Sequence, residues 1–536
     1  MDSVIYDPLE EFDRIYRARH GENTQRFFER LVKESGVDPE QNRKTVEQYH
    51  QSREELGKRR RKRNWLRFFR VLMCITVLLI PLVIWKLTPA IRALKKEIEK
   101  AEERAEELLA QAYAQMEPLN RLFTDGDSLT LTADSIPLLS FAPCFSVEQE
   151  TDMRINYDFS EEQPLERSTL GLLAGHYNEN PFLFENLRVH TMGTHTYHGY
   201  KTIHWTETYR DSKGNLATRT RSQTLSASVT KPKPFYSTQA VLSYCSQGAP
   251  ELCFYRDASD VEEKSEKQVE KMVRRGERAL QKKAEEALRG NGSFTAMSNT
   301  EFEVLFDALD RDNEVQFRTL FTPLAQTNIV KLLRSPIGFG DDFCFSKELR
   351  TNRICSEHSR GRGLFVPAQR YASFDFSLIR ESFLSENEAF FKAVYFDFAP
   401  LWAIPAYQER PVHSLKPIPP LEQRYSLKEC EVLANAVDAR YVVHPDTKTE
   451  AIVKSEFLSS AEGVDTARIR SYSYDIQGRV TVVPVMGGDG RLHDVTVCWD
   501  EYLPLEHTEE FFIAAEELSE GKQVIARHNG LCIFTS

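Results

Sequence analysis

The sequence lacks several motifs on which functional assignments often rest. Its nine cysteines include no CxxC pair, and no GxSxG motif is present to display a nucleophilic serine. An excess of basic residues is also missing. The net charge of −11 argues against nucleic acid as the main partner, because phosphate binding needs a basic face. Long apolar runs are absent except in residues 65–87, and no cleavable signal peptide precedes that run.

The apolar run is predicted to be a single transmembrane helix. Residues 71–85 carry no formal charge, and the apolar side chains from Trp65 onward extend them to the length of about 20 residues that a span needs. This requires the arginines at its start to reach back to the headgroups. Trp65 and Trp85 stand at its ends, where aromatic rings favour the interface, and a basic run covers residues 58–63. A buried core helix, the alternative, needs neither feature.

The basic residues around this run predict its orientation. Residues 58–70 contain eight lysines and arginines, and residues 86–104 contain six. The difference favours a cytoplasmic N-terminus and an extracytoplasmic C-terminal bulk, with the cell membrane as the localisation and the lipid bilayer as a partner. The alternative is a cytosolic bulk with the basic run outside.

Eight cysteines follow the run, and they do not decide the side of the membrane. Outside the cytosol, Cys245 with Cys253 and Cys344 with Cys355 are the locally plausible disulfide pairs. Buried thiols in a reducing compartment explain the same residues equally well.

The rest of the chain is expected to form an α+β protein with a single transmembrane helix and a helical stalk. The expected order is a cytosolic helical segment (1–64), the transmembrane helix (65–87), a helical or coiled-coil stalk (88–118), a mixed β-rich α+β domain (119–410) with a charged helical insertion (260–290), and a C-terminal α+β domain (421–536). A proline-rich linker separates the last two domains.

Within the two helical segments, the spacing of apolar residues predicts separate helices. In residues 1–64, one helix is expected to begin near Pro8 and end at Gly21, and a second to cover residues 24–35. In the stalk a heptad places Ile91, Ile98, Ala105 and Ala112 at one core position. The stalk is therefore expected to allow self-association, although a solitary helix, or one packed on the following domain, fits the thin seam equally well.

Alternating apolar residues predict strands in the two domains. Residues 187–209 and 216–229 are expected to form a long hairpin around the turn 211–215. In the C-terminal domain we expect a helix near 427–437, turns at 477–478 and 487–490, and a helix near 509–518.

Two segments resemble a family of uncharacterised bacterial membrane-anchored proteins that is known only as a domain of unknown function. One is TYRDSKGNLATRTRSQTL, residues 208–225, and the other is FEVLFDALDRDNEVQFRTLFTPLAQTNIVKLL, residues 302–333. The resemblance covers about residues 90–410. Members often carry two membrane spans near the N-terminus, whereas this chain shows one. The resemblance implies no activity, cofactor or catalytic residue.

Four histidines in residues 190–204 are the leading candidates for a metal site. They are His190, His195, His198 and His204. A metal needs converging ligands. On one strand His198 and His204 share a face while His195 points to the other, and Gly193 marks a turn that separates His190. Histidines on the surface of a hairpin are the preferred interpretation.

Other candidate motifs are also explained without chemistry. Asp310 to Glu314 begins like a calcium loop but has Val315 at the sixth position and Phe321 at the twelfth, so we exclude it. Gly338-Phe339-Gly340 lacks the strand and helix of a dinucleotide turn. Ser356-Glu357-His358-Ser359 offers a nucleophile and a base, but catalytic partners usually meet through the fold. Asn291 begins a glycosylation sequon that a helix-ending turn also explains.

The sequence therefore predicts a single-pass membrane-anchored protein that serves as a binding or structural interaction module, with no catalytic residue, metal or cofactor assigned and its protein partner unknown. The alternative is a membrane-tethered hydrolase whose site is assembled from distant residues, among them His358 or the histidines of residues 190–204.

Overall fold

The computed structural model is an α+β protein with 44% helix, 33% strand and two antiparallel sheets, which confirms the α+β class predicted from the sequence. It describes residues 4–74, 87–160, 164–210, 212, 214–259, 261–289, 297–308, 310–411, 416–421, 423–515, 523–528 and 531–534. The chain forms two compact units. Unit 1 comprises Met1–Tyr6, Leu138–Leu364 and Asp397–Ser536, and unit 2 comprises Asp7–Pro137 and Phe365–Phe396. The expected linker near residue 415 lies inside unit 1, so the units do not divide there.

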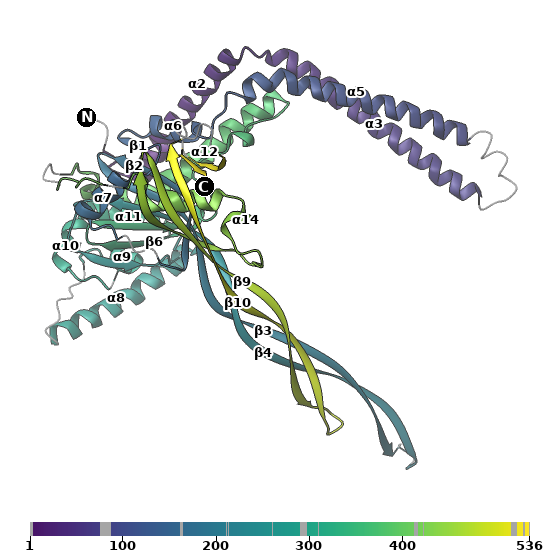
Figure 1. The fold of residues 1–536 in the computed structure, drawn as a ribbon. Coiled ribbons are helices and arrows are strands. Elements are labelled where there is room, and N and C mark those ends of the chain that lie inside the picture. Colours follow the sequence, from purple (N-terminus) through teal and green to yellow (C-terminus); the bar gives the residue numbers. More distant parts are fainter. Residues whose placement is uncertain are drawn as a thin grey trace. The chain divides into compact units, whose positions relative to one another are not determined.

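Unit 2 begins with one continuous helical segment (Figure 1). It consists of α1 (Pro8–Glu11), a π-helical turn η1 (Phe12–Tyr16) and α2 (Arg17–Ser35). The prediction that Gly21 ends a first helix is wrong, because the segment continues through Gly21, where an added Cβ would meet nothing within 4 Å. The segment ends at Gly36, whose φ of +66° suits glycine.

Two long helices of unit 2 pack side by side (Figure 1). They are α3 (Pro39–Cys74) and α5 (Thr88–Asn120), and the first residues of α3 donate to the carboxylate of Asp38. The heptad positions Ile91, Ile98, Ala105 and Ala112 are buried. The predicted helix over residues 88–118 is therefore confirmed, and α3 of the same chain packs on it.

The predicted transmembrane helix lies mostly outside the described residues. Its C-terminal part, residues 75–86, falls between the end of α3 at Cys74 and the start of α5 at Thr88, and residues 65–74 belong to α3. Among the helices that are described, none is long and apolar enough to cross a membrane.

Aromatic side chains form the core of unit 2. Phe12 and Tyr16 pack against Tyr395 of α12 (Phe376–Trp402), and Phe28 packs against Phe383 of the same helix. Another described helix of this unit is α6 (Asp127–Ser135). The N-terminal helices thus bury their apolar face against a helix that comes more than 300 residues later in the chain.

Unit 1 contains a seven-stranded antiparallel sheet of order β1-β2-β3-β4-β7-β6-β5. The strands are β1 (Leu139–Phe141), β2 (Arg167–Tyr177), β3 (Asn180–Arg210), β4 (Leu216–Cys245), β5 (Cys253–Arg256), β6 (Phe343–Glu348) and β7 (Thr351–Ser356). The helices of this part are α7 (Val147–Tyr157), α8 (Glu266–Arg289), α9 (Thr300–Phe306), α10 (Glu314–Leu320) and α11 (Pro323–Leu333). The expected hairpin and the helical insertion are both confirmed.

The second sheet of unit 1 has five strands in the order β11-β12-β10-β9-β8. They are β8 (Ile452–Ala461), β9 (Val464–Met486), β10 (Leu492–Ala515), β11 (Val524–His528) and β12 (Leu531–Phe534). Helix α13 (Leu427–Ala436) packs on this sheet, and α14 (Ala439–Val442) follows it.

Two sequence predictions fail in this sheet. Residues 509–515 belong to β10 instead of a helix, because Phe511 and Ile513 alternate into the core with the period of a strand. Gly478 lies inside β9 opposite Asp500, so no turn forms there. The turn at residues 487–490 is confirmed.

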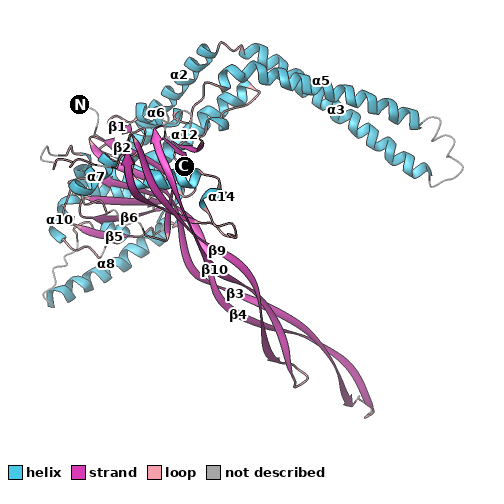
Figure 2. Cartoon of the chain, in the orientation of Figure 1, coloured by secondary structure: helices cyan, strands magenta, loops and turns pink. Residues whose placement is uncertain are grey.

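The two longest hairpins form a double-layered arm (Figure 2). The β3–β4 hairpin packs against the β9–β10 hairpin through a small core around Ile203, Leu225, Val495 and Val497. The residues 473–511 contain eight acidic and two basic residues, whereas residues 190–241 contain seven basic and two acidic ones. Between the layers, the ammonium of Lys231 lies 4.3 Å from the centroid of the Trp499 ring, and Gln223 accepts a hydrogen bond from the amide of Gly488. We call this two-layered element the arm.

Candidate functional site

A groove on one face of the seven-stranded sheet is a candidate site in unit 1. It has a volume of about 780 Å³ and crosses β2, β3, β4, β7, β6 and β5. Six neighbouring strands cover roughly 24 Å at the usual strand spacing. Residues of α13 and β8 close one end. The shape suits an extended ligand lying across the strands.

Two buried ion pairs form the closed end of the groove. The ammonium of Lys428 lies 2.6 Å from Glu185, and that of Lys454 lies 3.1 Å from Glu431. Burial alone would lower the pKa of Lys428, but Glu185 and then Glu431 outweigh it and raise that pKa. Lys428 is therefore held in its charged form in a buried part of the site.

The local backbone explains why Glu431 is buried there. The register of β2 against β3 shifts between Thr169 and Gly171, and the amide of Thr169 donates to Glu431 at 3.0 Å. Glu431 also faces Lys454 from a neighbouring strand. A bulge in one sheet thus anchors α13, which itself packs on the other sheet.

The lining of the groove is balanced in charge. Four carboxylates and four basic side chains line it: Glu166, Glu185, Glu348, Glu431, Arg167, Arg353, Lys428 and Lys454. Tyr255, Cys344 and Cys355 line the part farthest from α13. A balanced lining favours a ligand with groups of both signs over a polyanion.

Two cysteines of the groove face each other across neighbouring strands. Cys344 of β6 is the register partner of Cys355 of β7. Cys245 of β4, in contrast, pairs with Thr351 of β7, and Thr351 pairs with Glu348 of β6. Glu348 in turn pairs with Cys253 of β5, so two strands lie between the two cysteines. Three strand spacings separate that second pair by roughly 14 Å, too far for a disulfide. Of the two pairs that the sequence offers, only Cys344 with Cys355 has the required geometry.

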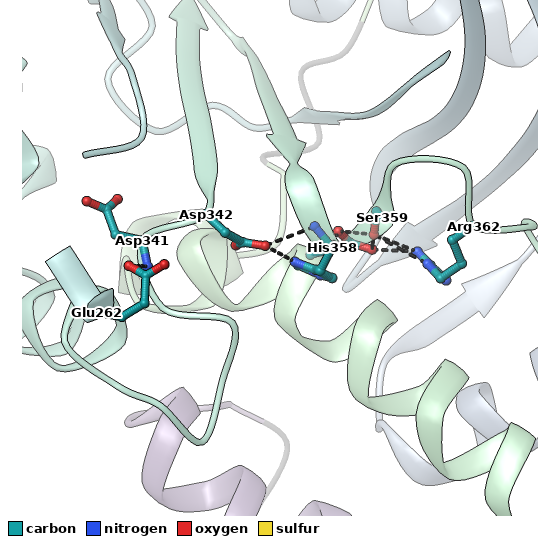
Figure 3. A network of polar contacts seen from close by, with 7 residues as sticks. Glu262, Asp341, Asp342, His358, Ser359 and Arg362 are labelled. Atoms are coloured by element: carbon teal, nitrogen blue, oxygen red, sulfur yellow. Dashed lines mark hydrogen bonds and ion pairs between the residues drawn. The ribbon is translucent and has the colours of Figure 1, made fainter. Parts of the chain in front are cut away.

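His358, the other candidate of the sequence, lies in a buried charge network (Figure 3). Its Nδ1 lies 2.6 Å from Asp342, which directly precedes β6, and its Nε2 lies 3.3 Å from Asp397 of α12. Phe339 stacks on the imidazole with ring centroids 3.9 Å apart. Burial lowers the pKa of His358, but Asp342 and Asp397 outweigh it and raise that pKa to about 9.

Ser359 and Arg362 complete the network around Asp397. The hydroxyl of Ser359 donates to Asp397 at 2.8 Å, and the guanidinium of Arg362 lies 2.6 Å from the same carboxylate. Burial raises the pKa of Asp397, but Arg362 and His358 lower that pKa by more than burial raises it. The pKa of Asp397 therefore lies below its usual range. Two carboxylates, one imidazolium and one guanidinium balance each other.

This network does not have the properties of a hydrolytic site. A serine nucleophile needs a neutral imidazole that accepts its proton. His358 is protonated at neutral pH, and the Ser359 hydroxyl is directed to Asp397. The network instead links two segments of unit 1. His358, Ser359 and Arg362 lie shortly before Leu364, where the chain leaves unit 1, and Asp397 is the residue at which the chain returns to it.

The four histidines of the arm do not converge. His190 contacts Tyr474, and His195 stacks edge-on with Tyr197. His198 and His204 are exposed. Throughout the described parts of the chain, no group of three or more His, Cys, Asp or Glu side chains is placed to hold a metal ion. Gly193, expected as a turn, lies within β3.

The remaining motifs serve the fold. Asp310 and Asp312 of the calcium-like loop accept hydrogen bonds from the backbone of Tyr255 and Cys253, at 3.1 and 2.8 Å. Phe339 of the glycine-flanked motif packs on His358. Asn291 lies outside the described residues.

Sequence reasoning missed the partners that define both sites. Asp342 and Asp397 lie 16 and 39 residues from His358, and Glu185 lies 243 residues from Lys428. No local pattern marks such pairs. A buried position for a charged residue could have been suspected only from the apolar neighbours of Asp397 in residues 393–404.

Comparison with protein-family models, with curated proteins and with solved structures finds no match for this chain.

Proposed function

We propose that this protein is a membrane-attached binding module whose ligand is an extended peptide held in the groove of unit 1. The observation that carries the proposal is the groove itself, a face of six strands with a closed, charge-paired end. Its length matches roughly seven residues of extended chain. A peptide offers side chains of both signs and backbone groups for the polar lining.

Attachment to a membrane is the second part of the proposal, and it rests on residues 65–87. Their composition supports insertion into lipid, as do the aromatic residues at both ends. The resemblance of residues 208–225 and 302–333 to a membrane-anchored bacterial family agrees with attachment and stays an expectation.

The hydrolase alternative has less support. His358 is occupied by two carboxylates, and the arm histidines lie apart from one another. We therefore place the function in binding.

A peptide library displayed on phage, selected on the purified full chain, tests the groove. We expect enriched peptides that bind the wild type and lose at least roughly tenfold in affinity to Gln239→Trp, whose indole would fill the groove. The matched control is Thr238→Trp. Thr238 is exposed and points to the opposite face of the same strand, so binding should persist. Peptides that bind Gln239→Trp and the wild type equally would refute the groove as the site.

A further inference from the structure

The packing of α3 on α5 brings together the two basic segments that flank the apolar run. Asn42 of α3 contacts Gln115 of α5, and Arg60 contacts Glu102 at 2.6 Å. As residue numbers rise along α3 they fall along α5, so the helices are antiparallel. The basic residues 58–70 consequently lie beside the first turns of α5.

The ends of the two helices are level with each other. Cys74 lies fourteen residues beyond Arg60 (60 to 74), and Thr88 lies fourteen residues before Glu102 (88 to 102). Each end is therefore about 21 Å from the same contact. Ile91, near the start of α5, is still buried, and α3 packs along α5. A single membrane crossing would instead separate the two ends by about 30 Å of hydrocarbon.

The joined end of the helix pair is strongly basic. Residues 58–70 and 87–96 contain eleven lysines and arginines and no aspartate or glutamate. Some of these cations pair with acidic residues farther along the helices, as Arg60 does with Glu102. Within the described chain, the other seven form no ion pair with a carboxylate, and Lys62, Arg67, Arg92 and Lys96 are among them.

Two large aromatic side chains are exposed at the same end. Trp65 is 60% exposed and Phe68 is 64% exposed, although Trp65 also contacts Phe69. Exposed aromatic rings beside unpaired cations are typical of a surface that rests in the headgroup region of a membrane. A nucleic acid would use the cations but would give no reason for both rings to lie in solvent beside an uncharged run.

We propose that residues 58–70 and 87–96 form one lipid-facing surface that binds anionic phospholipid headgroups, with both flanks of the apolar run on the same side of the membrane. This inference rests on the proposed membrane attachment and names its lipid partner. This proposal replaces the orientation expected from the sequence. That expectation put the two basic segments on opposite sides of the membrane, whereas in the structure they lie side by side. The lysines and arginines of the two segments then determine which lipids the protein prefers, and they do not determine the orientation of a transmembrane helix.

Vesicle flotation of the full chain tests the lipid partner. We expect roughly tenfold or tighter binding to vesicles of phosphatidylcholine and phosphatidylglycerol than to phosphatidylcholine alone, with the preference falling as salt rises. Replacing Lys62, Arg67, Arg92 and Lys96 by glutamine should remove the preference. The matched control replaces Lys267, Lys271, Arg274 and Lys282 of α8, which are also on a charged helix, and should keep it.

Each contrary result has a distinct meaning. Equal binding to both vesicle types would overturn the anionic-lipid surface while leaving attachment intact. Binding to neither vesicle type would overturn the proposed attachment itself. Displacement from anionic vesicles by a short DNA duplex at equal phosphate concentration would overturn the choice of lipid as the partner.

Topology is tested in sealed cells with a membrane-impermeant maleimide. Gln51→Cys and Glu103→Cys place exposed thiols on α3 and α5, and both should be labelled from the same side. Labelling of only one from outside would overturn the same-side arrangement. The pair Arg60→Cys and Glu102→Cys should cross-link in the membrane, whereas the distant pair Arg60→Cys and Gln115→Cys should not.

Discussion

Cys344 of β6 lies directly opposite Cys355 of β7, and both thiols line the groove of unit 1. Directly opposed residues of antiparallel strands have Cα atoms about 4.5–5.5 Å apart, a separation that a disulfide spans. The position of this pair links the redox state of the chain to the shape of its candidate binding site.

Mild oxidation with a small-molecule disulfide should join Cys344 to Cys355 and leave Cys245 and Cys253 unjoined. Burial, and then Cys344, raises the pKa of Cys355 to about 12, so the reaction should accelerate as pH rises. Peptide mapping by mass spectrometry without reduction identifies the pair, and Cys344→Ser should abolish it. A disulfide between Cys245 and Cys253 would show that the strand order given for this sheet is incorrect.

The charge network around His358 should make unit 1 less stable as pH rises. The folded pKa of about 9 lies above the unfolded value of about 6.5, so the imidazolium stabilises fully below pH 6.5. That stabilisation, at most about 3 kcal/mol, is lost as pH rises through 9. Urea unfolding of the wild type and of His358→Gln at a series of pH values measures it.

His20 of unit 2 provides a control of opposite sign. Burial lowers the pKa of His20 to about 4, so its contribution is present above pH 6.5 and lost as pH falls through 4. Hydrogen exchange read separately for the two units should show unit 1 opening first on the alkaline side and unit 2 first on the acid side. A flat response of unit 1 between pH 6.5 and 9 would contradict the role assigned to His358.

The packing of the arm depends on Gly199. A Cβ built there would lie 2.1 Å from the carbonyl oxygen of Thr496, so Gly199→Val should force the two hairpins apart at a cost of about 1–3 kcal/mol. Protection of Val495 and Val497 from hydrogen exchange should fall with it. Gly478→Ala, also in the arm but with nothing within 4 Å of its added Cβ, is the matched control.

The buried end of the groove should be sensitive to the loss of one charge. Lys428 is 14% exposed, and Lys428→Met leaves Glu185 unpaired in a buried position, with an expected cost of about 3–5 kcal/mol. Lys448 pairs with Asp475 but is 56% exposed, so Lys448→Met should cost less than about 1 kcal/mol. Equal losses in thermal unfolding would mean that Lys428 is hydrated in solution.

The sequence predicts the local elements of this fold better than their partners. Residues 211–215 predict a hairpin, because turn residues stand between alternating strands. The strands nevertheless extend further than predicted, over Asn180–Arg210 and Leu216–Cys245. Gly193 does not form the expected turn but lies within β3, where the ring of Phe235 is close to it. Burial also explains why residues 509–515 form a strand and not the predicted helix, because Phe511 packs in the sheet core despite the charged residues around it.

The candidate sites were beyond the reach of local patterns for the same reason. Asp397 meets His358, and Glu185 meets Lys428, only because distant segments fold together. The heptad of α5 correctly marked a packing seam, but nothing in it distinguishes a second copy of the chain from α3.

The discontinuous make-up of unit 2 sets an order of events during synthesis. Phe12, Tyr16 and Phe28 leave the ribosome early, yet the residues that cover them lie in α12. At a translation rate of about 5–20 residues per second, the first helices wait tens of seconds for that helix. The nascent chain therefore exposes an aromatic surface while most of unit 1 is being synthesised. Until α12 is made, its solubility depends on other contacts that cover this surface.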